Sequence, residues 1–184
     1  MEIKGTAVKS IYNFVKERHK EKLQLWLDAL PAEAKNIMQN PILATDWYDL
    51  NKGCVLPTTA LKVLYNNDVK KAAWESGRFS ADSALTGIYK VFIKVSSPNF
   101  IISRAGKIFE TYYRPSKIEV VSNVGKTVNL HITEFPEPNK VIDYRIAGWM
   151  ERALEINNCK NVRVNLPQMM SGGFNVTEFD ISWE

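Results

Sequence analysis

The sequence predicts an α+β fold, with several helices in its N-terminal part and an antiparallel sheet gathered in its C-terminal half. Three observations support this prediction. Apolar residues recur at spacings of three and four up to Pro115, and after Pro115 the spacing changes to two. A helical pattern over residues 140–157 then separates two pairs of predicted strands. The C-terminal half therefore has the order strand-strand-helix-strand-strand.

Three short helices are predicted near the N-terminus, where apolar residues recur at helical spacing over residues 7–18, 23–30 and 32–39. Thr6 is expected to cap the first helix, because a threonine hydroxyl accepts a hydrogen bond from an amide of the first helical turn. Residues 42–50 show no clean period. We expect them to form a connection that Trp47 and Tyr48 anchor to the core.

Longer helices are predicted over residues 57–75, 82–95 and 99–113. The first is expected to break at Asn66 and Asn67, and Gly77 is expected to end that segment, since these residue types favour turns. Pro115 follows the third helix and cannot continue it. The apolar arcs of the second and third helices are wide, which indicates that both are buried on more than one side.

A β-hairpin is predicted after Pro115, because apolar and polar residues alternate on both sides of a turn at Gly125 and Lys126. The apolar positions of the two strands are Ile118, Val120, Val128, Leu130 and Ile132. The helix over residues 140–157 follows and contains Gly148, whose simplest explanation is close contact with a neighbouring backbone. A third strand is expected around Val164. A last strand is expected over residues 174–183, with a β-bulge near Thr177 and Glu178.

Composition indicates an ordinary globular protein, and we expect residues 1–184 to form a single domain. The net charge of +4 comes from scattered Lys and Arg residues, which favours a solvated surface and no nucleic-acid partner. An anionic partner or membrane surface remains an open alternative. No apolar run approaches the ~20 residues that span a bilayer, so we expect no membrane insertion and a cytoplasmic location.

No catalytic or metal-binding motif is evident in the sequence. The two histidines, His19 and His131, are isolated from one another and are expected on the surface. Cys54 and Cys159 are far apart and form no C-x-x-C pair, so neither a disulfide framework nor a zinc site is expected. We therefore expect no catalytic residue, no metal site and no enzymatic activity.

The apolar helices offer a different opportunity, because a pocket forms wherever they fail to fill the space against the sheet. The candidate pocket residues are Ile88, Phe92, Ile101, Ile102, Ala105, Phe109, Ile146 and Trp149. Two alternatives stay open at this point. These residues can pack into a dry core, or a second copy of the chain can cover the excess apolar surface.

Three short motifs carry a resemblance to a known superfamily: Ile3–Thr6, the helix that ends at Arg114–Pro115, and Gly148–Leu154. With the order of elements, they resemble the heme-dependent nitric oxide/oxygen-binding (H-NOX) sensor domains. The vinyl-reductase-like ligand-binding domains and the Bet-type subunits of the TRAPP trafficking complex belong to the same superfamily. Trp47-Tyr48 and the helix from Gly148 also resemble an uncharacterised bacterial family of the myxobacterial type.

The resemblance implies an H-NOX-like fold, but two of its heme anchors have no counterpart in this sequence. The heme sensors carry the iron-ligating histidine on the helix before the proline. Alignment on Pro115 places that position near Ile102, and residues 99–115 contain no histidine. The motif that holds the heme propionates is replaced by residues 135–140, Phe-Pro-Glu-Pro-Asn-Lys. The resemblance therefore implies no heme cofactor here.

We weigh four functions for this chain. The leading hypothesis is a non-enzymatic, heme-free sensor or binding domain that holds a small apolar ligand or signals through contacts with a signalling protein. The alternative is a dimeric protein–protein interaction module like the Bet-type trafficking subunits. A heme-based gas sensor is the more remote alternative. An enzyme ranks last, because nothing in the sequence requires a cleft with paired polar groups.

Overall fold

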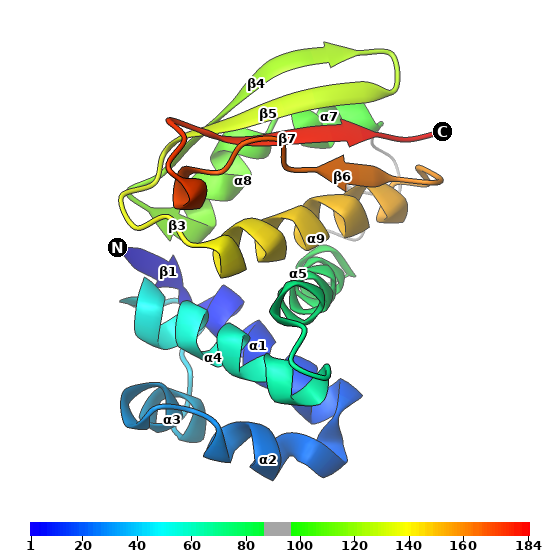
Figure 1. The fold of residues 1–184 in the computed structure, drawn as a ribbon. Helices are drawn as coiled ribbons and strands as arrows, with labels where there is room; N and C mark the ends of the chain where they lie inside the picture. The colour runs from blue at the N-terminus through cyan, green and yellow to red at the C-terminus, as the bar shows by residue number, and fades with distance from the viewer. Residues whose placement is uncertain (87–96) are drawn as a thin grey trace.

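A computed structural model of the protein describes residues 1–86 and 97–184. An antiparallel sheet of four strands forms one end of the molecule, and the N-terminal helices form the other end (Figure 1). The long helix α9 (Lys140–Ile156) lies between them, directly against the sheet, and α5 (Val69–Thr86) crosses its other side (Figure 1). This architecture confirms the predicted α+β class.

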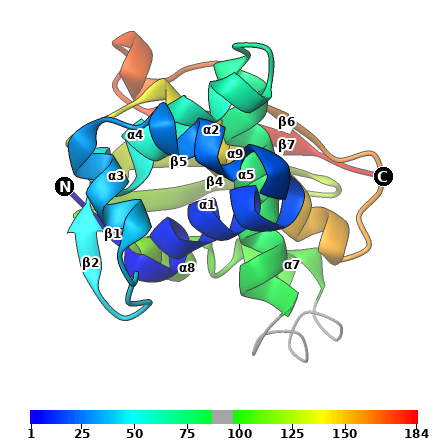
Figure 2. The same ribbon diagram turned by 90° about the horizontal axis from the view of Figure 1, so that it is seen from below.

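The N-terminal helices are short and follow one another closely, as predicted (Figure 2). They are α1 (Gly5–Arg18), the 3-10 turn η1 (Lys20–Lys22), α2 (Leu23–Asp28), α3 (Ala32–Gln39), the π-helical turn η2 (Asn51–Val55), α4 (Leu56–Ala60) and the 3-10 turn η3 (Leu61–Leu64). Thr6 does not cap α1, because the helix already begins at Gly5. The amide of Gly5 instead donates to the carbonyl of Asp46 at 2.8 Å, so a neighbouring loop supplies the acceptor.

A small antiparallel sheet joins segments that are distant in sequence, in the strand order β2-β1-β3. Its strands are β1 (Glu2–Lys4), β2 (Trp47–Asp49) and β3 (Tyr113–Arg114). Ile3 in the central strand pairs with Tyr48 on one side and with Tyr113 on the other. The connection predicted over residues 42–50 is therefore partly a strand. Two or three residues are too few to show the alternation by which a strand is recognised.

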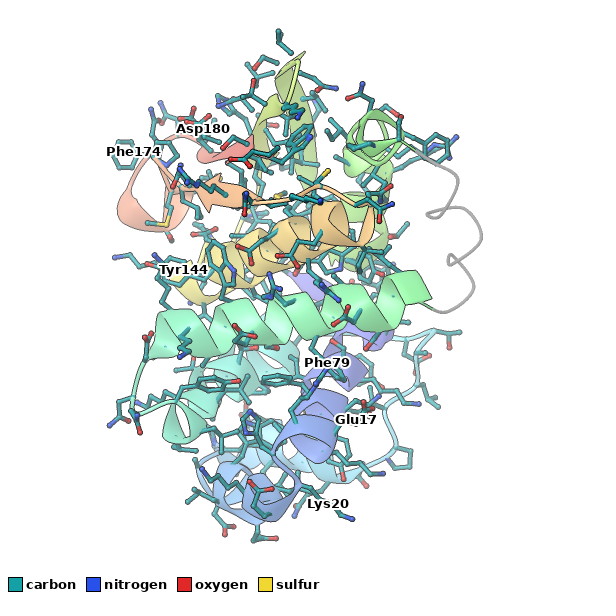
Figure 3. All side chains as sticks on the ribbon, turned by 90° about the vertical axis from the view of Figure 1, so that its right-hand side faces the viewer. Glu17, Lys20, Phe79, Tyr144, Phe174 and Asp180 are labelled. Carbon is teal, nitrogen blue, oxygen red and sulfur yellow. The ribbon has the colours of Figure 1, made fainter. Side chains whose placement is uncertain are left out.

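Helix α5 runs without interruption through Gly77, so the predicted helix end at that residue is wrong. A Cβ atom on Gly77 would lie 2.0 Å from the carbonyl oxygen of Arg145, and one on Gly148 would lie 2.2 Å from that of Trp74. Both glycines therefore mark the close approach of α5 and α9, which confirms the close contact expected at Gly148. Figure 3 shows these two helices side by side. The predicted break at Asn66 and Asn67 is confirmed, since both residues adopt positive φ angles.

The predicted helix over residues 99–113 is divided into α7 (Pro98–Ile102) and α8 (Ala105–Tyr112). The hydroxyl of Ser103 donates to the carbonyl of Phe100 at 2.9 Å, and Arg104 has non-helical dihedral angles. A serine that bonds locally to the backbone competes with the helical pattern. Most of the helix predicted over residues 82–95 lies outside the described residues, and its first part, up to Thr86, is the end of α5.

The larger sheet is fully antiparallel and has the strand order β4-β5-β7-β6. Its strands are β4 (Lys117–Val124), β5 (Thr127–Glu134), β6 (Arg163–Asn165) and β7 (Thr177–Ser182), and the 3-10 turn η4 (Met170–Gly172) precedes β7. The β4–β5 pair confirms the predicted hairpin, with Gly125 in its turn at φ 62°. The last strand begins at Thr177 and not at Phe174, whose ring is exposed (Figure 3).

No bulge interrupts the pairing of β7 with β5, so the bulge predicted near Thr177 and Glu178 is wrong. The register irregularities of this sheet lie in the β4–β5 pair instead, one of them between Val120 and Ser122. Phe174 and Val176 suggested a longer strand because they are apolar, but they belong to the loop before it. Among residues 1–86 and 97–184, no helix combines the length and the apolar character needed to cross a membrane.

Candidate functional site: an apolar cavity with a buried arginine

A cavity of about 80 Å³ lies between the helices and the larger sheet. Helices α7 and α8 form one wall, α9 forms a second, and strands β4, β5 and β7 close it from the sheet side (Figure 1). Ala7 of α1 and Ser80 of α5 reach the cavity at its end nearest the N-terminal helices. The lining is almost wholly apolar, which is the usual character of a small-molecule pocket.

Six of the eight pocket candidates line this cavity. They are Ile101, Ile102, Ala105, Phe109, Ile146 and Trp149. The remaining two, Ile88 and Phe92, lie outside the described residues. The six come from three helices. Ala105 and Phe109 are four residues apart, and Ile146 and Trp149 are three apart, so each of these pairs lies on one side of its helix. Ile102 stands in this wall, at the position to which the sequence comparison assigned the iron-ligating histidine.

The sheet supplies cavity residues that were not among the candidates. They are Ile118 of β4, Val128 and Leu130 of β5, and Ile181 of β7. The apolar alternation of the hairpin already placed the first three on one face of the sheet. Only the arrangement of the chain in space shows that this face turns towards α8 and α9, because pairing and layering depend on contacts distant in sequence.

Arg145 on α9 is the feature of the cavity that the sequence analysis missed. Its side chain is buried, with 3% of its surface exposed, and it lines the cavity. One terminal nitrogen donates to the carbonyl of Ala7 at 3.2 Å and to the hydroxyl of Ser10 at 2.9 Å. The Nε–H group has no hydrogen-bond partner among the described residues. The sequence signal for this buried arginine is its position on the apolar side of the helix, where a charged residue is unusual.

The groups that surround Arg145 do not neutralise its charge. Burial raises the pKa of the Tyr113 phenol well above the usual range, and the nearby guanidinium opposes this increase only in part, so the phenol stays neutral. Cys54 is fully buried, and burial raises the pKa of its thiol as well. An arginine in a protein keeps its proton under all ordinary conditions. A positive charge therefore lies at the end of an apolar cavity.

No carboxylate forms an ion pair with Arg145 in the part of the chain that the structure describes. Residues 87–96 contain neither Asp nor Glu. The other arginines of α5 and α9 differ in this respect. Arg78 binds Glu151 and Glu155, and Arg152 binds Asp82 and Glu155.

Asp143 is the buried carboxyl group of α9, and it faces the loop around η4 rather than Arg145. Its oxygens accept hydrogen bonds from the hydroxyls of Ser171 and Thr177. Burial raises the pKa of Asp143 to about 6, and these two hydrogen bonds oppose the increase. Asp143 thus fixes the loop that leads into β7 and takes no part in the cavity.

A second, polar hollow lies on the other side of α5, where Phe14, His19 and Tyr65 meet the ion pairs of Arg78 and Arg152. His19 is partly buried, and its Nε2 lies 3.1 Å from the Tyr65 hydroxyl, so it is not the exposed residue that was expected. Burial lowers the pKa of His19. Its aromatic neighbours and single polar partner indicate a packing role.

His131 on β5 is also partly buried, and its Nε2 lies 3.7 Å from Glu178 of β7. Neither histidine lines the apolar cavity, and neither do Cys54 and Cys159, which are both buried. Within residues 1–86 and 97–184, no group of three His, Cys, Asp or Glu side chains could hold a metal ion.

The architecture is that of a known fold. The chain is similar to an H-NOX protein from S. oneidensis determined in the Fe(II)NO ligation state, with a TM-score of 0.73, 12% identity and 99% of each chain covered. The fold is H-NOX-like. An unliganded Fe(II) H-NOX protein from K. algicida gives a TM-score of 0.68 at 10% identity, over 99% of this chain and 97% of that one.

A third H-NOX structure, of a mutant protein from T. tengcongensis, gives a TM-score of 0.67 at 11% identity, over 99% of this chain and 98% of that one. No protein-family model matches the sequence, and no curated protein matches it either. At these identities the H-NOX-like similarity concerns the fold. It confirms the fold that the sequence resemblance implied.

Proposed function

We propose that this H-NOX-like protein is a heme-free, non-enzymatic binding domain whose cavity holds a small ligand that is largely apolar. The observation that carries the proposal is the cavity itself, which α7, α8, α9 and the sheet enclose with apolar side chains. Such pockets bind ligands by excluding water, and a few polar groups fix the ligand's orientation. A sensor role fits this proposal, since the H-NOX structures include one determined in an Fe(II)NO ligation state.

The size of the cavity supports a ligand smaller than heme. The cavity here is about 80 Å³, whereas heme contains four pyrrole rings and two propionates. The side chains of Ile102, Phe109 and Ile146 line this small volume.

The residue types that line the cavity also support a ligand other than heme. Histidine and cysteine are the usual strong proximal ligands. Neither residue type is among the described cavity-lining residues, and residues 87–96 contain none. Tyr113 lines the cavity, but burial raises the pKa of its phenol and keeps it protonated, although the neighbouring Arg145 opposes this increase. These residues are therefore suited to a ligand without iron.

A second candidate function, an interaction module, is favoured by the edge strand β4. Val120, Val121 and Val124 on this strand are exposed. Exposed apolar residues on an unpaired strand edge favour pairing with another chain. From the sequence, we expected the exposed apolar surface of a dimeric module to lie on a helix and not on a strand. Sedimentation of the wild type and of a Val121→Lys, Val124→Lys variant would test it, since a dimer that depends on β4 should dissociate in the variant.

The cavity proposal is tested with xenon, an apolar probe that enters small dry cavities. We expect xenon to shift the methyl NMR signals of Ile102, Ile146 and Leu154 in a saturable way. Ala153 lines the cavity, so Ala153→Leu should fill it and abolish the shifts. Ala73→Leu is the matched control, because Ala73 is a buried alanine of α5 that does not line the cavity. Absence of saturable shifts in the wild type would refute the proposal.

A further inference from the structure

We infer that Arg145 is the anion-binding end of the cavity and that the ligand is a short-chain carboxylate. This inference rests on the proposed function and names the ligand class for the same site. The carboxylate would bind the guanidinium, and its short apolar tail would lie among the side chains of α8, α9 and the sheet. Three features of the site support it: the unbalanced charge, the free donor, and the distribution of polarity along the cavity.

The first feature is the unbalanced charge. Removing a guanidinium from water is costly, and an attractive partner of opposite charge normally offsets much of that cost. Arg145 is buried, yet its described partners are the neutral groups of Ala7, Ser10 and Tyr113. Residues 87–96 hold no acidic side chain that could supply the missing charge. An anion from outside the chain would complete the site.

The second feature is the free donor. A guanidinium has five N–H donors arranged as a planar fork, and buried donors are seldom left without a partner. The Nε–H of Arg145 is buried and unpartnered among the described residues. Nε together with a terminal nitrogen can bind both oxygens of a carboxylate in a bidentate manner. The donor that such a ligand needs is thus still available.

The third feature is the distribution of polarity. Arg145 is the only charged side chain among the described residues that line the cavity. The polar groups at its end, Ser80 and Tyr113, are neutral, and the remaining walls are mainly aliphatic and aromatic. A single fixed positive charge suits a ligand with one negative charge, such as a carboxylate. The apolar walls suit a tail of a few carbon atoms, given a volume of about 80 Å³.

The test compares butyrate with butyramide, which has a similar shape and no charge. In titrations of the full chain followed by calorimetry and methyl NMR, we expect butyrate to bind at least about tenfold more tightly. Arg145→Met should remove this preference, and Arg145→Lys should retain only part of it, because lysine lacks the planar fork. Arg152→Met is the matched control. It removes a positive charge from the same helix outside the cavity, and the preference should persist.

The xenon experiment separates failure of this inference from failure of the proposed function. If xenon enters the cavity while butyrate and butyramide bind equally or not at all, the carboxylate assignment is wrong and the apolar pocket stands. If xenon does not enter, the proposed function fails. Should Arg145→Met not fold, as judged by circular dichroism, the comparison of butyrate with butyramide in the wild type still decides the question.

Discussion

Asp143 gives the protein a measurable pH dependence at the scale of a single residue. Its pKa is about 6 in the folded protein, against 3.8 for an ordinary aspartate, because burial disfavours the charged form. Between these two values the folded state binds more protons than the unfolded state, so the free energy of unfolding falls as pH rises through this range. Below pH 3.8 the stabilisation is complete, and above pH 6 it is lost.

Asp143→Asn removes this titration and keeps an oxygen that accepts from Ser171 or Thr177. We expect the variant to gain stability relative to the wild type as pH rises from 4 to 7, by roughly 2–3 kcal/mol for a pKa shift of this size. Urea unfolding of both proteins at several pH values measures the difference directly. A difference that stays constant with pH would contradict the burial effect.

The burial of Arg145 depends on contacts with residues that are distant in the sequence. Its position on the apolar side of α9 was the available signal, but arginines on helices usually reach solvent, so the sequence did not show that the guanidinium lies in the core. Its partners Ala7 and Ser10 lie on α1, at the far end of the sequence. Such partners follow from the packing of α1 against α9, which no local pattern encodes.

The glycines of α5 and α9 make a prediction at the scale of elements. Gly148→Ala would place a methyl group 2.2 Å from the Trp74 carbonyl oxygen, so the helices would have to separate. The lost packing should outweigh the helix propensity gain of about 1 kcal/mol and lower the unfolding free energy by about 2 kcal/mol. Chemical denaturation followed by tryptophan fluorescence measures this loss.

Gly106→Ala is the matched control for that substitution. Gly106 also lies in a helix, but the nearest atom to its added Cβ would be the Ile118 carbonyl oxygen at 3.4 Å, close to ordinary contact. We expect stability to be unchanged or raised by up to about 1 kcal/mol. Equal effects of the two substitutions would show that the close approach of α5 and α9 is not what Gly148 provides.

The predictability of the elements follows from their length and periodicity. Helix α9 and the β4–β5 hairpin are long enough to show their apolar periods, and the sequence predicted both. The three-residue strands β1 and β2 were missed because alternation needs more residues. The helix end predicted at Gly77 was wrong, because a single sequence does not distinguish a glycine that ends a helix from one that allows close contact with a neighbouring helix. The apolar positions of the predicted helices included the six described helix residues that line the cavity. The existence of the cavity depends on how α8, α9 and the sheet pack together, which the sequence does not show.

At the scale of the whole molecule, the size and lining of the cavity lead to a prediction about heme. Although the fold is H-NOX-like, we expect hemin added to the purified protein to form no stoichiometric complex, because the cavity is too small and offers no histidine or cysteine among the described residues. Absorbance near the Soret region after gel filtration measures retained heme. A one-to-one complex with a defined Soret band would show that α7 and α8 open to admit the macrocycle.

The proposed function depends above all on a small apolar pocket within a fold that this chain shares with iron-containing H-NOX proteins. A crystal structure under xenon pressure is the decisive measurement, because xenon locates accessible apolar cavities. We predict a xenon peak bounded by Ile102, Phe109 and Ile146, and no such peak in Ala153→Leu. A wild-type structure without xenon at this position, with the cavity closed by its own side chains, would contradict the proposal.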